Sequence, residues 1–455
     1  MRTHHRVWLL ALVALACTRS DPPNVLLVTL DTTRADRLGA YGFGAARTPN
    51  LDAFAREAVL YEQAYAPSSW TLPSHASLFT GLLPRQHGAQ TAPDGVSEPL
   101  GYAVRPLDER FRTLAERLAD AGYRTAGVVA GPALSGELGV GQGFALYDDD
   151  FSAPGAAANG RRAEPVVDRA IAAMRDGDRP WFVFVNLFDP HAPYRPPAPH
   201  DAGLPQPDLG RLTGALVARL TSDTGTAPET WEQETIRALL AGYDAEIAYM
   251  DLHLGRLLAA ADAAPGATFV AITSDHGESF GEHGYLSHGA HLYEDNLHVP
   301  LLVRAPGAAP RRVATPTGNR ALFAGILAAA GLPVPAGAPR LDDRHGWLLH
   351  EVGPSDANVR LFGAFFDRRL HALRVPPHKL IVSSRGPAEL YDVAADPAEA
   401  SDLAGRDPDL RRRLEARLAE VQRDHPPLFD AASRAELSAE TREALERLGY
   451  LEGED

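Results

Sequence analysis

The sequence is almost without cysteine and lysine. Its 455 residues include one cysteine, Cys17, and one lysine, Lys379, so arginine carries nearly all of the positive charge. A single cysteine excludes a disulfide within the chain. Acidic residues outnumber basic ones by 59 to 44, which gives a net charge of −15. This excess argues against the phosphate backbone of a nucleic acid as a partner.

A long apolar run is also missing from the N-terminus. Val7–Ala16 is apolar but too short to span a bilayer comfortably, and Arg2 and Arg6 precede it. Ala14-Leu15-Ala16 directly before Cys17 resembles a bacterial lipobox, although its leucine is displaced by one place. We expect residues 1–21 to be a signal segment and linker with a lipid anchor on Cys17. Simple secretion and an uncleaved anchor are the alternatives, and each places the chain outside the cytoplasm.

The rest of the chain has an ordinary globular composition, with 45% hydrophobic and 23% charged residues. Apolar runs rich in β-branched residues alternate with amphipathic stretches. This alternation predicts an α/β fold with a doubly wound, mainly parallel sheet. The predicted strands are 24–30, 123–130, 181–188 and 268–273. The predicted helices are 51–58, a stretch beginning at Thr71, 114–122, 164–174, 245–261 and 408–421.

The chain length suits one large domain with a smaller appendage. The run GLPVPAGAP at 331–339 marks the end of the main sheet. We therefore expect a catalytic domain at 22–350, a small α+β subdomain at 351–423 that includes a strand-like run at 359–366, and a polar helical tail at 424–455. The proline-rich segment 189–213 is predicted to cross the surface near the functional site.

Metal-ligating side chains follow the predicted strands directly. Asp31 comes after the strand 24–30, and Asp275 and His276 come after the strand 268–273. Carboxyl ends of parallel strands form the edge at which α/β proteins build their sites. Carboxylate and imidazole together suit a divalent cation, although an aspartate at a strand end can also cap the next helix. We expect Asp31, Asp275 and His276 to bind a metal.

The stretch SSWTLPSHASLFTG contains a candidate nucleophile, Thr71. Pro73 suits the first turn of a helix, so Thr71 can be a helix N-cap and nothing more. The functional alternative uses the same geometry, because a hydroxyl at a helix N-terminus lies beside free N–H groups that favour an anion. A bound cation would lower the pKa of that hydroxyl and make it a nucleophile.

Histidines supply further candidates. His191 directly follows the strand 181–188, and His288 lies in a glycine-flanked loop after His276. Either could hold an oxyanion or protonate a leaving oxygen. For His283 and His291, a surface role is as well supported as a functional one.

Nearly all of the sequence after the leader resembles the sulfatase family of the alkaline phosphatase superfamily. The motifs that carry this resemblance are PNVLLVTLDTTRADRLGAYG, RTPNLDAFAREAVLYEQAYA, PSHASLFTGLLPRQHG, FDPHAPYRPP, YDAEIAYMDLHLGRLL, TSDHGESFGEHG, LYEDNLHVPLLVRAPG and ELYDVAADPAEASDLA. The resemblance implies an alkaline phosphatase-like fold, with Thr71 at the nucleophile and metal-touching position, Asp31, Asp275 and His276 as metal ligands, and His191 and His288 at substrate or leaving-group contacts.

The departures from the family pattern concern catalysis. The family's signature begins with Cys or Ser, which is oxidised to formylglycine, and continues to a proline and an arginine; here these positions hold Thr71, Pro73 and His75. Thr32 stands at the family's second aspartate, His288 at its usual lysine, and the later Gly-Lys-Trp-His segment has no counterpart. Threonine cannot form the formylglycine hydrate. Separately, His75 is a candidate replacement for the missing arginine.

These departures favour a metal-dependent enzyme that cleaves or transfers phosphate mono- or diesters through a threonine nucleophile. A sulfatase with an atypical nucleophile and an inactive binding lipoprotein are the alternatives. The aspartate and histidine mixture favours zinc or manganese, with calcium and magnesium as alternatives. Asp189, His191 and His288 are available for a second metal. The expected partners are a small-molecule, glycan or lipid ester and a membrane.

Overall fold

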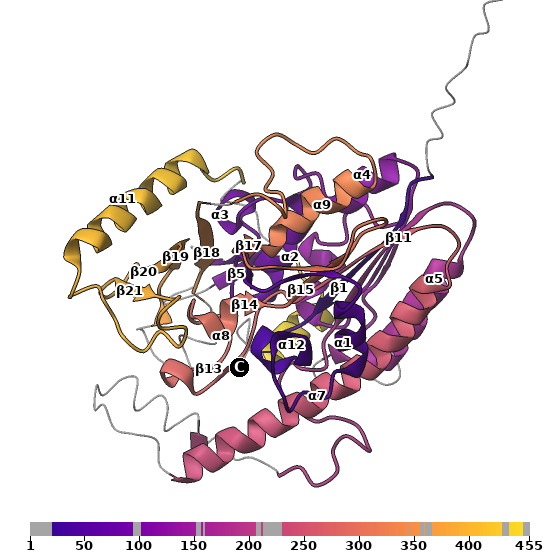
Figure 1. Cartoon of the computed structure of the whole chain (residues 1–455). Helices are drawn as coiled ribbons and strands as arrows, with labels where there is room; N and C mark the ends of the chain where they lie inside the picture. Colours follow the sequence, from indigo (N-terminus) through magenta and orange to yellow (C-terminus); the bar gives the residue numbers. More distant parts are fainter. Residues whose placement is uncertain are drawn as a thin grey trace, which may run out of the picture.

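The structure is a computed structural model (Figure 1). It describes residues 21–93, 102–151, 156–157, 160–205, 211–212, 230–344, 346–354, 359, 366–429 and 436–448. The predicted leader with Cys17 therefore lies outside the described residues, as does most of the predicted strand at 359–366. Within the described ranges, no helix is both long and apolar enough to cross a membrane.

An eight-stranded sheet forms the centre of the molecule. Its strand order is β16-β2-β15-β11-β1-β10-β6-β7. The block from β11 to β7 is parallel, whereas β15 runs antiparallel to both of its neighbours. The strands are β1 (Asn24–Leu30), β2 (Val59–Tyr61), β6 (Arg124–Val128), β7 (Leu146–Asp148), β10 (Trp181–Leu187), β11 (Thr268–Thr273), β15 (Leu301–Arg304) and β16 (Arg311–Val313).

Alternate residues of β1 enter two different cores. Leu26 and Val28 face a cluster that contains α1, α5 and α7, whereas Val25 and Leu27 face a cluster that contains α2, α4 and α9. A strand buried on both faces reads as a continuous apolar run, which is why NVLLVTL shows no alternation. Figure 1 shows α5 and α7 on one side of the sheet and α4 and α9 on the other. The helices are α1 (Pro49–Ala55), α2 (Thr71–Thr80), α4 (Leu114–Asp120), α5 (Ala163–Arg175), α7 (Thr230–Asp262) and α9 (Leu322–Ala329).

The predicted α/β fold with a doubly wound, mainly parallel sheet is confirmed. β1 and β11 begin and end at the predicted residues. The helix predicted at 245–261 is the second half of α7, which begins fifteen residues earlier at Thr230. The first half of α7 contains several charged residues, and most of its described side chains are less buried than those of the second half, so its apolar periodicity is weak.

Shorter elements connect and flank this sheet. The short strands are β3 (Ala64–Tyr65), β4 (Gln90–Pro93), β5 (Tyr102–Arg105), β8 (Ala156–Ala157), β9 (Gly160–Arg161), β12 (Ser279–Phe280), β13 (Leu286–Ser287), β14 (His298–Val299) and β17 (Thr317–Gly318). The short helices are α3 (Pro84–His87), α8 (Glu294–Leu297), η1 (Ala35–Arg37), η2 (Gly39–Tyr41), η3 (Pro132–Leu134), η4 (Gly136–Leu138), η5 (Glu282–Gly284) and η6 (Asn319–Ala321).

A second, antiparallel sheet lies toward the C-terminus and carries helix α11 on one face (Figure 1). It contains β18 (Leu348–Val352), β19 (Leu370–Val375), β20 (His378–Ser383) and β21 (Glu389–Asp392), and α11 spans Pro408–Asp424. The sheet confirms the predicted α+β subdomain, and β18 spans the predicted boundary at 350. In the tail, α12 (Ala439–Arg447) packs back on the main domain, with Leu445 buried in the same core as α2.

The single lysine joins the two parts of the molecule. Lys379 in β20 is fully buried and forms ion pairs with Glu399 at 2.7 Å and with Glu294 in α8 at 3.0 Å. Arg374 in β19 also pairs with Glu294. Burial raises the pKa of Glu399, and the charge of Lys379 opposes that rise. The cluster therefore depends on its cations to keep two carboxylates charged.

Lys379→Met is expected to lower the free energy of unfolding by about 3 kcal/mol, because it leaves the buried Glu399 without its cation. Urea unfolding followed by circular dichroism measures the change. Arg412→Gln, which removes an exposed pair with Asp409 on α11, serves as the control and should leave the transition in place. Equal transitions for Lys379→Met and the wild type would contradict this account.

Candidate metal centre

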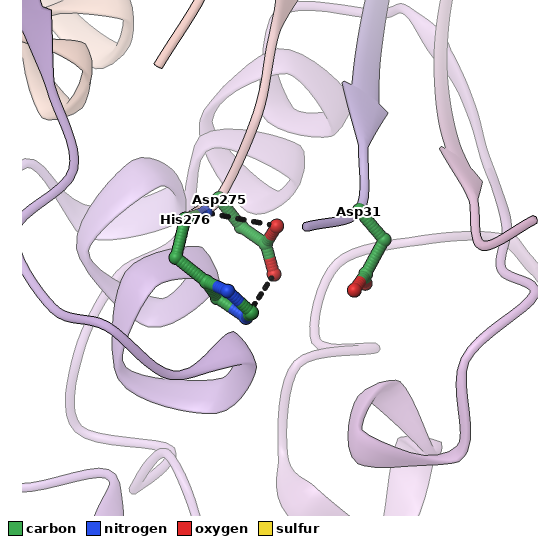
Figure 2. A group of neighbouring side chains, drawn as sticks. All are labelled: Asp31, Asp275 and His276. Atoms are coloured by element: carbon green, nitrogen blue, oxygen red, sulfur yellow. Dashed lines mark hydrogen bonds and ion pairs between the residues drawn. The ribbon is translucent and has the colours of Figure 1, made fainter. Parts of the chain in front are cut away.

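The ligand residues come from two neighbouring parallel strands. Thr29 of β1 is in register with Thr273 of β11, so Asp31 and Asp275, each two residues further on, emerge at the same level of the sheet edge. His276 follows directly. Figure 2 shows the two carboxylates and the imidazole ring directed toward a common space. One candidate ligand atom from each of the three residues lies within 4.8 Å of the others.

Two carboxylate oxygens in this space have no hydrogen-bond donor among the described residues. Asp31 Oδ1 and Asp275 Oδ2 are buried and accept no hydrogen bond there. The other oxygens are satisfied: Asn186 Nδ2 donates to Asp31 Oδ2 at 3.2 Å, and the backbone N–H groups of Thr32 and His276 donate to Asp275 Oδ1. A buried carboxylate oxygen without a donor is costly unless a cation binds it.

The imidazole of His276 also directs a lone pair at this space. Its Nδ1 donates to the carbonyl oxygen of Gly277 at 2.9 Å, which leaves Nε2 as the other nitrogen, 3.3 Å from Asp275 Oδ2. Burial lowers the pKa of His276, so the neutral ring is favoured. A lone pair and two carboxylate oxygens facing one another repel, and a divalent ion converts that repulsion into coordination. The residues present therefore fit a divalent metal.

The pKa values of the two carboxylates move in opposite directions. Burial and the charge of Asp275 raise the pKa of Asp31 well above its ordinary value. Burial acts to raise the pKa of Asp275 too, but the facing His276 and His75 lower it. Asp31 is thus the group whose ionisation depends most on a bound cation.

Thr71 lies beside this centre. It is the first residue of α2 and is fully buried, and its Oγ1 is 3.2 Å from His276 Nε2. The capping alternative is not what the structure shows, because the N-cap position is Trp70, and Thr71 is already the first residue of the helix. The hydroxyl therefore contacts one of the candidate metal ligands, His276, at the N-terminal turn of α2, where backbone N–H groups lack intrahelical partners.

His75 lies one turn further along α2 and is fully buried. Its Nδ1 donates to the carbonyl oxygen of Thr71 at 2.9 Å, and its Nε2 is 3.0 Å from Thr29 Oγ1. Nδ1 is also 3.7 Å from Asp275 Oδ2. Both nitrogens of His75 therefore have partners within the chain, the backbone of Thr71 and the hydroxyl of Thr29.

His288 lies beside His276, and His191 lies beside His288. The ring of His288 lies 4.3 Å from that of His276 and 4.9 Å from that of His191, measured between centroids. His191 stacks on Phe188 at 4.3 Å. Burial lowers the pKa of His288 to about 4 and that of His191 to about 3. The structure therefore brings these two predicted residues together with the metal ligands.

Glu278 was missed by the sequence analysis. It is fully buried, and its Oε1 lies 3.0 Å from His288 Nδ1. Burial raises the pKa of Glu278 to about 7. With the low pKa of His288, this favours a neutral pair in which Glu278 donates to Nδ1 and the proton of His288 resides on Nε2. Glu278 stands two residues after His276 in SDHGE, but the sequence does not show that it meets a side chain ten positions away.

One carboxylate oxygen of Asp189 is engaged elsewhere, and the other, Oδ2, is buried without a hydrogen-bond partner among the described residues. Its Oδ1 accepts from the backbone N–H of Ala163, the first residue of α5, at 3.1 Å, and Arg162 lies 3.9 Å away. Burial raises the pKa of Asp189 to about 6. Among the described residues, Asp31, Asp275 and His276 are the one group of three or more that meets the spacing of a metal site.

The remaining candidate histidines lie in other contacts. His283 stacks on Tyr293 with ring centroids 3.7 Å apart, and His291 Nε2 lies 2.8 Å from Ser279 Oγ. His291 is buried and is therefore not a surface residue, whereas His283 is only partly buried and lines a cavity.

Thr32 occupies a strained position next to Asp31. Its backbone has a φ of 53°, which is unusual for a β-branched residue, and its buried Oγ1 has no hydrogen-bond partner among the described residues. The left-handed residue turns the chain sharply, so that Thr32 N–H reaches Asp275. This turn holds Asp31 and Asp275 face to face.

The protein-family model described as Sulfatase matches residues 23–332. The chain is similar to an uncharacterized sulfatase, YidJ, of Escherichia coli K12, with 25% identity over 437 residues that cover 84% of this chain and 83% of YidJ. In fold it is similar to a phosphonate monoester hydrolase of Agrobacterium radiobacter, with a TM-score of 0.70, 24% identity and coverage of 89% of this chain and 96% of that one.

A further similar structure is a protein solved with its substrate D-glucosamine-2-N,6-O-disulfate. Its TM-score is 0.71, with 19% identity and coverage of 89% of this chain and 98% of that one. The family match spans more than half of the chain and includes every residue of the candidate metal centre. The chain thus belongs to the sulfatase family of ester hydrolases, within the alkaline phosphatase-like superfamily.

Proposed function

We propose that the chain is an exported, metal-dependent hydrolase that cleaves or transfers phosphate mono- or diesters through Thr71. The observation that carries the proposal is the 3.2 Å contact between Thr71 Oγ1 and His276 Nε2 at the first turn of α2. A divalent ion held by Asp31, Asp275 and His276 would supply a Lewis acid that lowers the pKa of the Thr71 hydroxyl.

The chain's own residues account for the other parts of the reaction. Thr71 Oγ1 loses its proton to water and attacks the phosphorus atom, the P–O bond to the leaving group breaks, and a threonine ester forms. The first-turn N–H groups of α2 stabilise negative charge on the transferred group. His288, whose Nδ1 faces Glu278, holds a proton on Nε2 for the leaving oxygen. Water then hydrolyses the threonine ester, or an acceptor hydroxyl takes the group. His191 contacts the substrate, and His75 positions Thr71.

Phosphate rather than sulfate is favoured by the nucleophile. A formylglycine hydrate releases sulfate by elimination from its second hydroxyl, and a threonine has no such hydroxyl. A threonine ester must instead be displaced by an outside nucleophile, which phosphoryl transfer accomplishes with a metal and positioning. The fold similarity to a phosphonate monoester hydrolase supports this direction. Sulfate ester hydrolysis with an atypical nucleophile is the second candidate, supported by the family match.

We further propose that Cys17 carries a lipid anchor at the outer face of a bacterial membrane, with the catalytic domain beyond the linker. Cys17→Ser is expected to move the full-length chain from the membrane fraction to the soluble fraction of cells, as measured by immunoblotting. Retention of the variant in the membrane fraction would instead favour an uncleaved anchor.

Thr71→Ala is expected to lower kcat/KM by roughly 10³-fold or more, because it removes the attacking oxygen. Thr71→Ser keeps the hydroxyl and should retain activity. The measurement is hydrolysis of aryl phosphate monoesters, aryl phosphate diesters, aryl phosphonate monoesters and aryl sulfate by the metal-loaded enzyme.

Thr80→Ala, the same change at the far end of α2, controls for damage to the helix and should leave the rates unchanged. A hydrolysis rate that is unaltered in Thr71→Ala would contradict the nucleophile proposal and favour an inactive, binding lipoprotein. Hydrolysis of aryl sulfate alone would favour the sulfatase candidate.

Asp31→Asn is expected to weaken metal binding by at least ~100-fold, because it removes a charged ligand. Isothermal titration calorimetry with zinc and manganese measures this, with one ion bound per wild-type chain. Since burial and Asp275 raise the pKa of Asp31, wild-type binding will release a proton and tighten as the pH rises. Asp189→Asn, the matched control, should leave the stoichiometry at one; a loss of one of two bound ions in this variant would show a second metal site.

A further inference from the structure

A second cavity lies at the end of α2 opposite Thr71. Its volume is about 640 Å³, and its lining comes from β17, η6, described residues within 337–344 and 346–348, and the residue that follows α11. We call it the arginine pocket, defined by Arg320, Arg340, Arg344, Trp347 and His425. α2 has ten residues and rises about 1.5 Å per residue, so roughly 15 Å separate its two ends. The arginine pocket is therefore distinct from the metal centre.

The lining is strongly cationic in a chain whose net charge is −15. It carries three arginines and one carboxylate, Asp343. That carboxylate already accepts the backbone N–H of Arg340 at 3.1 Å. Arg344 is exposed. Positive charge collected at one cavity of an acidic protein indicates an anionic ligand.

Arg320 provides the strongest observation. Its Nη1 donates to the carbonyl oxygen of Gly81 at 2.6 Å, which is the carbonyl at the C-cap of α2. In the part of the chain that the structure describes, this is the one hydrogen bond of its side chain, and no carboxylate pairs with the guanidinium. Desolvation lowers the pKa of Arg320 to about 10. A guanidinium fixed in this way has donors left over and lacks a counter-charge.

Trp347 supplies an apolar wall beside these charges. It is partly buried, and its ring lies edge-to-face with that of His425 at 5.2 Å and 71°. An indole face can pack against the C–H groups of a sugar ring while guanidinium groups bind the ring's anionic substituents. A cavity of this size is large enough for a saccharide unit.

We propose that the arginine pocket binds a tetrahedral oxyanion, sulfate or phosphate, either free or carried on a saccharide. Arg320 and Arg344 donate charge-assisted hydrogen bonds to its oxygens, since the planar fork of a guanidinium matches such an anion. Trp347 covers the apolar side of the ligand. The arginine pocket binds this anion and catalyses no reaction, and binding requires neither Thr71 nor the candidate metal ligands.

Tryptophan fluorescence of the purified chain tests the proposal. The probes are inorganic sulfate, inorganic phosphate and a sulfated disaccharide, each titrated at constant ionic strength. We expect a saturable change that disappears in Trp347→Phe. Arg320→Gln and Arg344→Gln should each weaken binding by about tenfold, the loss of one charge-assisted hydrogen bond. Arg344 is exposed, so its replacement tests the pocket even if Arg320→Gln fails to fold.

Two controls separate the arginine pocket from other sites. Arg417→Gln makes the same charge change on the exposed side of α11, and Asp275→Asn disables the metal centre; both should bind as the wild type does. Equal affinity for the inorganic ions and the disaccharide indicates a site for the free anion, whereas about tenfold tighter binding of the disaccharide indicates a saccharide site. The proposal is overturned if no probe gives a saturable change, or if Arg344→Gln binds all three as tightly as the wild type.

Discussion

Mutual repulsion between two buried carboxylates is the constraint on which this structure depends. Asp31 and Asp275 are held at one level by the register of β1 and β11, and each has a buried oxygen that accepts no hydrogen bond from the described residues. A folded chain tolerates this only where a bound cation, or a proton on Asp31, compensates for it. The parallel sheet, with its apolar strands buried on both faces, provides the rigid frame that keeps the carboxylates from moving apart.

The surrounding residues fix the positions of the candidate catalytic groups relative to these two carboxylates. Three features orient Asp31, Asp275 and Thr71. They are the left-handed turn at Thr32, the hydrogen bond from Asn186 and the two bonds of His75. His191, His288 and Glu278 form a second group of contacts beside His276. Under the proposed function, Thr71 needs no adjacent general base, because a cation held by the candidate ligands and the first turn of α2 would provide the electrostatic activation.

The two ends of helix α2 lie at chemically different sites, the candidate metal centre and the arginine pocket. Its N-terminus brings Thr71 to the metal ligands, and its C-terminal Gly81 anchors Arg320. Gly81 has a φ of 73°, which favours glycine, and an added Cβ would meet Phe323 at 2.7 Å. The same tight packing that ends the helix therefore also places a guanidinium in the arginine pocket.

The sequence by itself determined the α/β class and the strands β1 and β11, and it singled out the three residues that the structure brings together at the candidate metal centre. It could do so because a strand buried on both faces leaves a continuous apolar run, and because the residue after such a run must lie at the carboxyl edge of a parallel sheet. Tertiary structure alone decided that Thr71 meets His276 rather than capping α2, that Glu278 pairs with His288, and that Asp189 caps α5. These contacts join residues from separate elements, and local periodicity carries no information about which side chains meet across a fold.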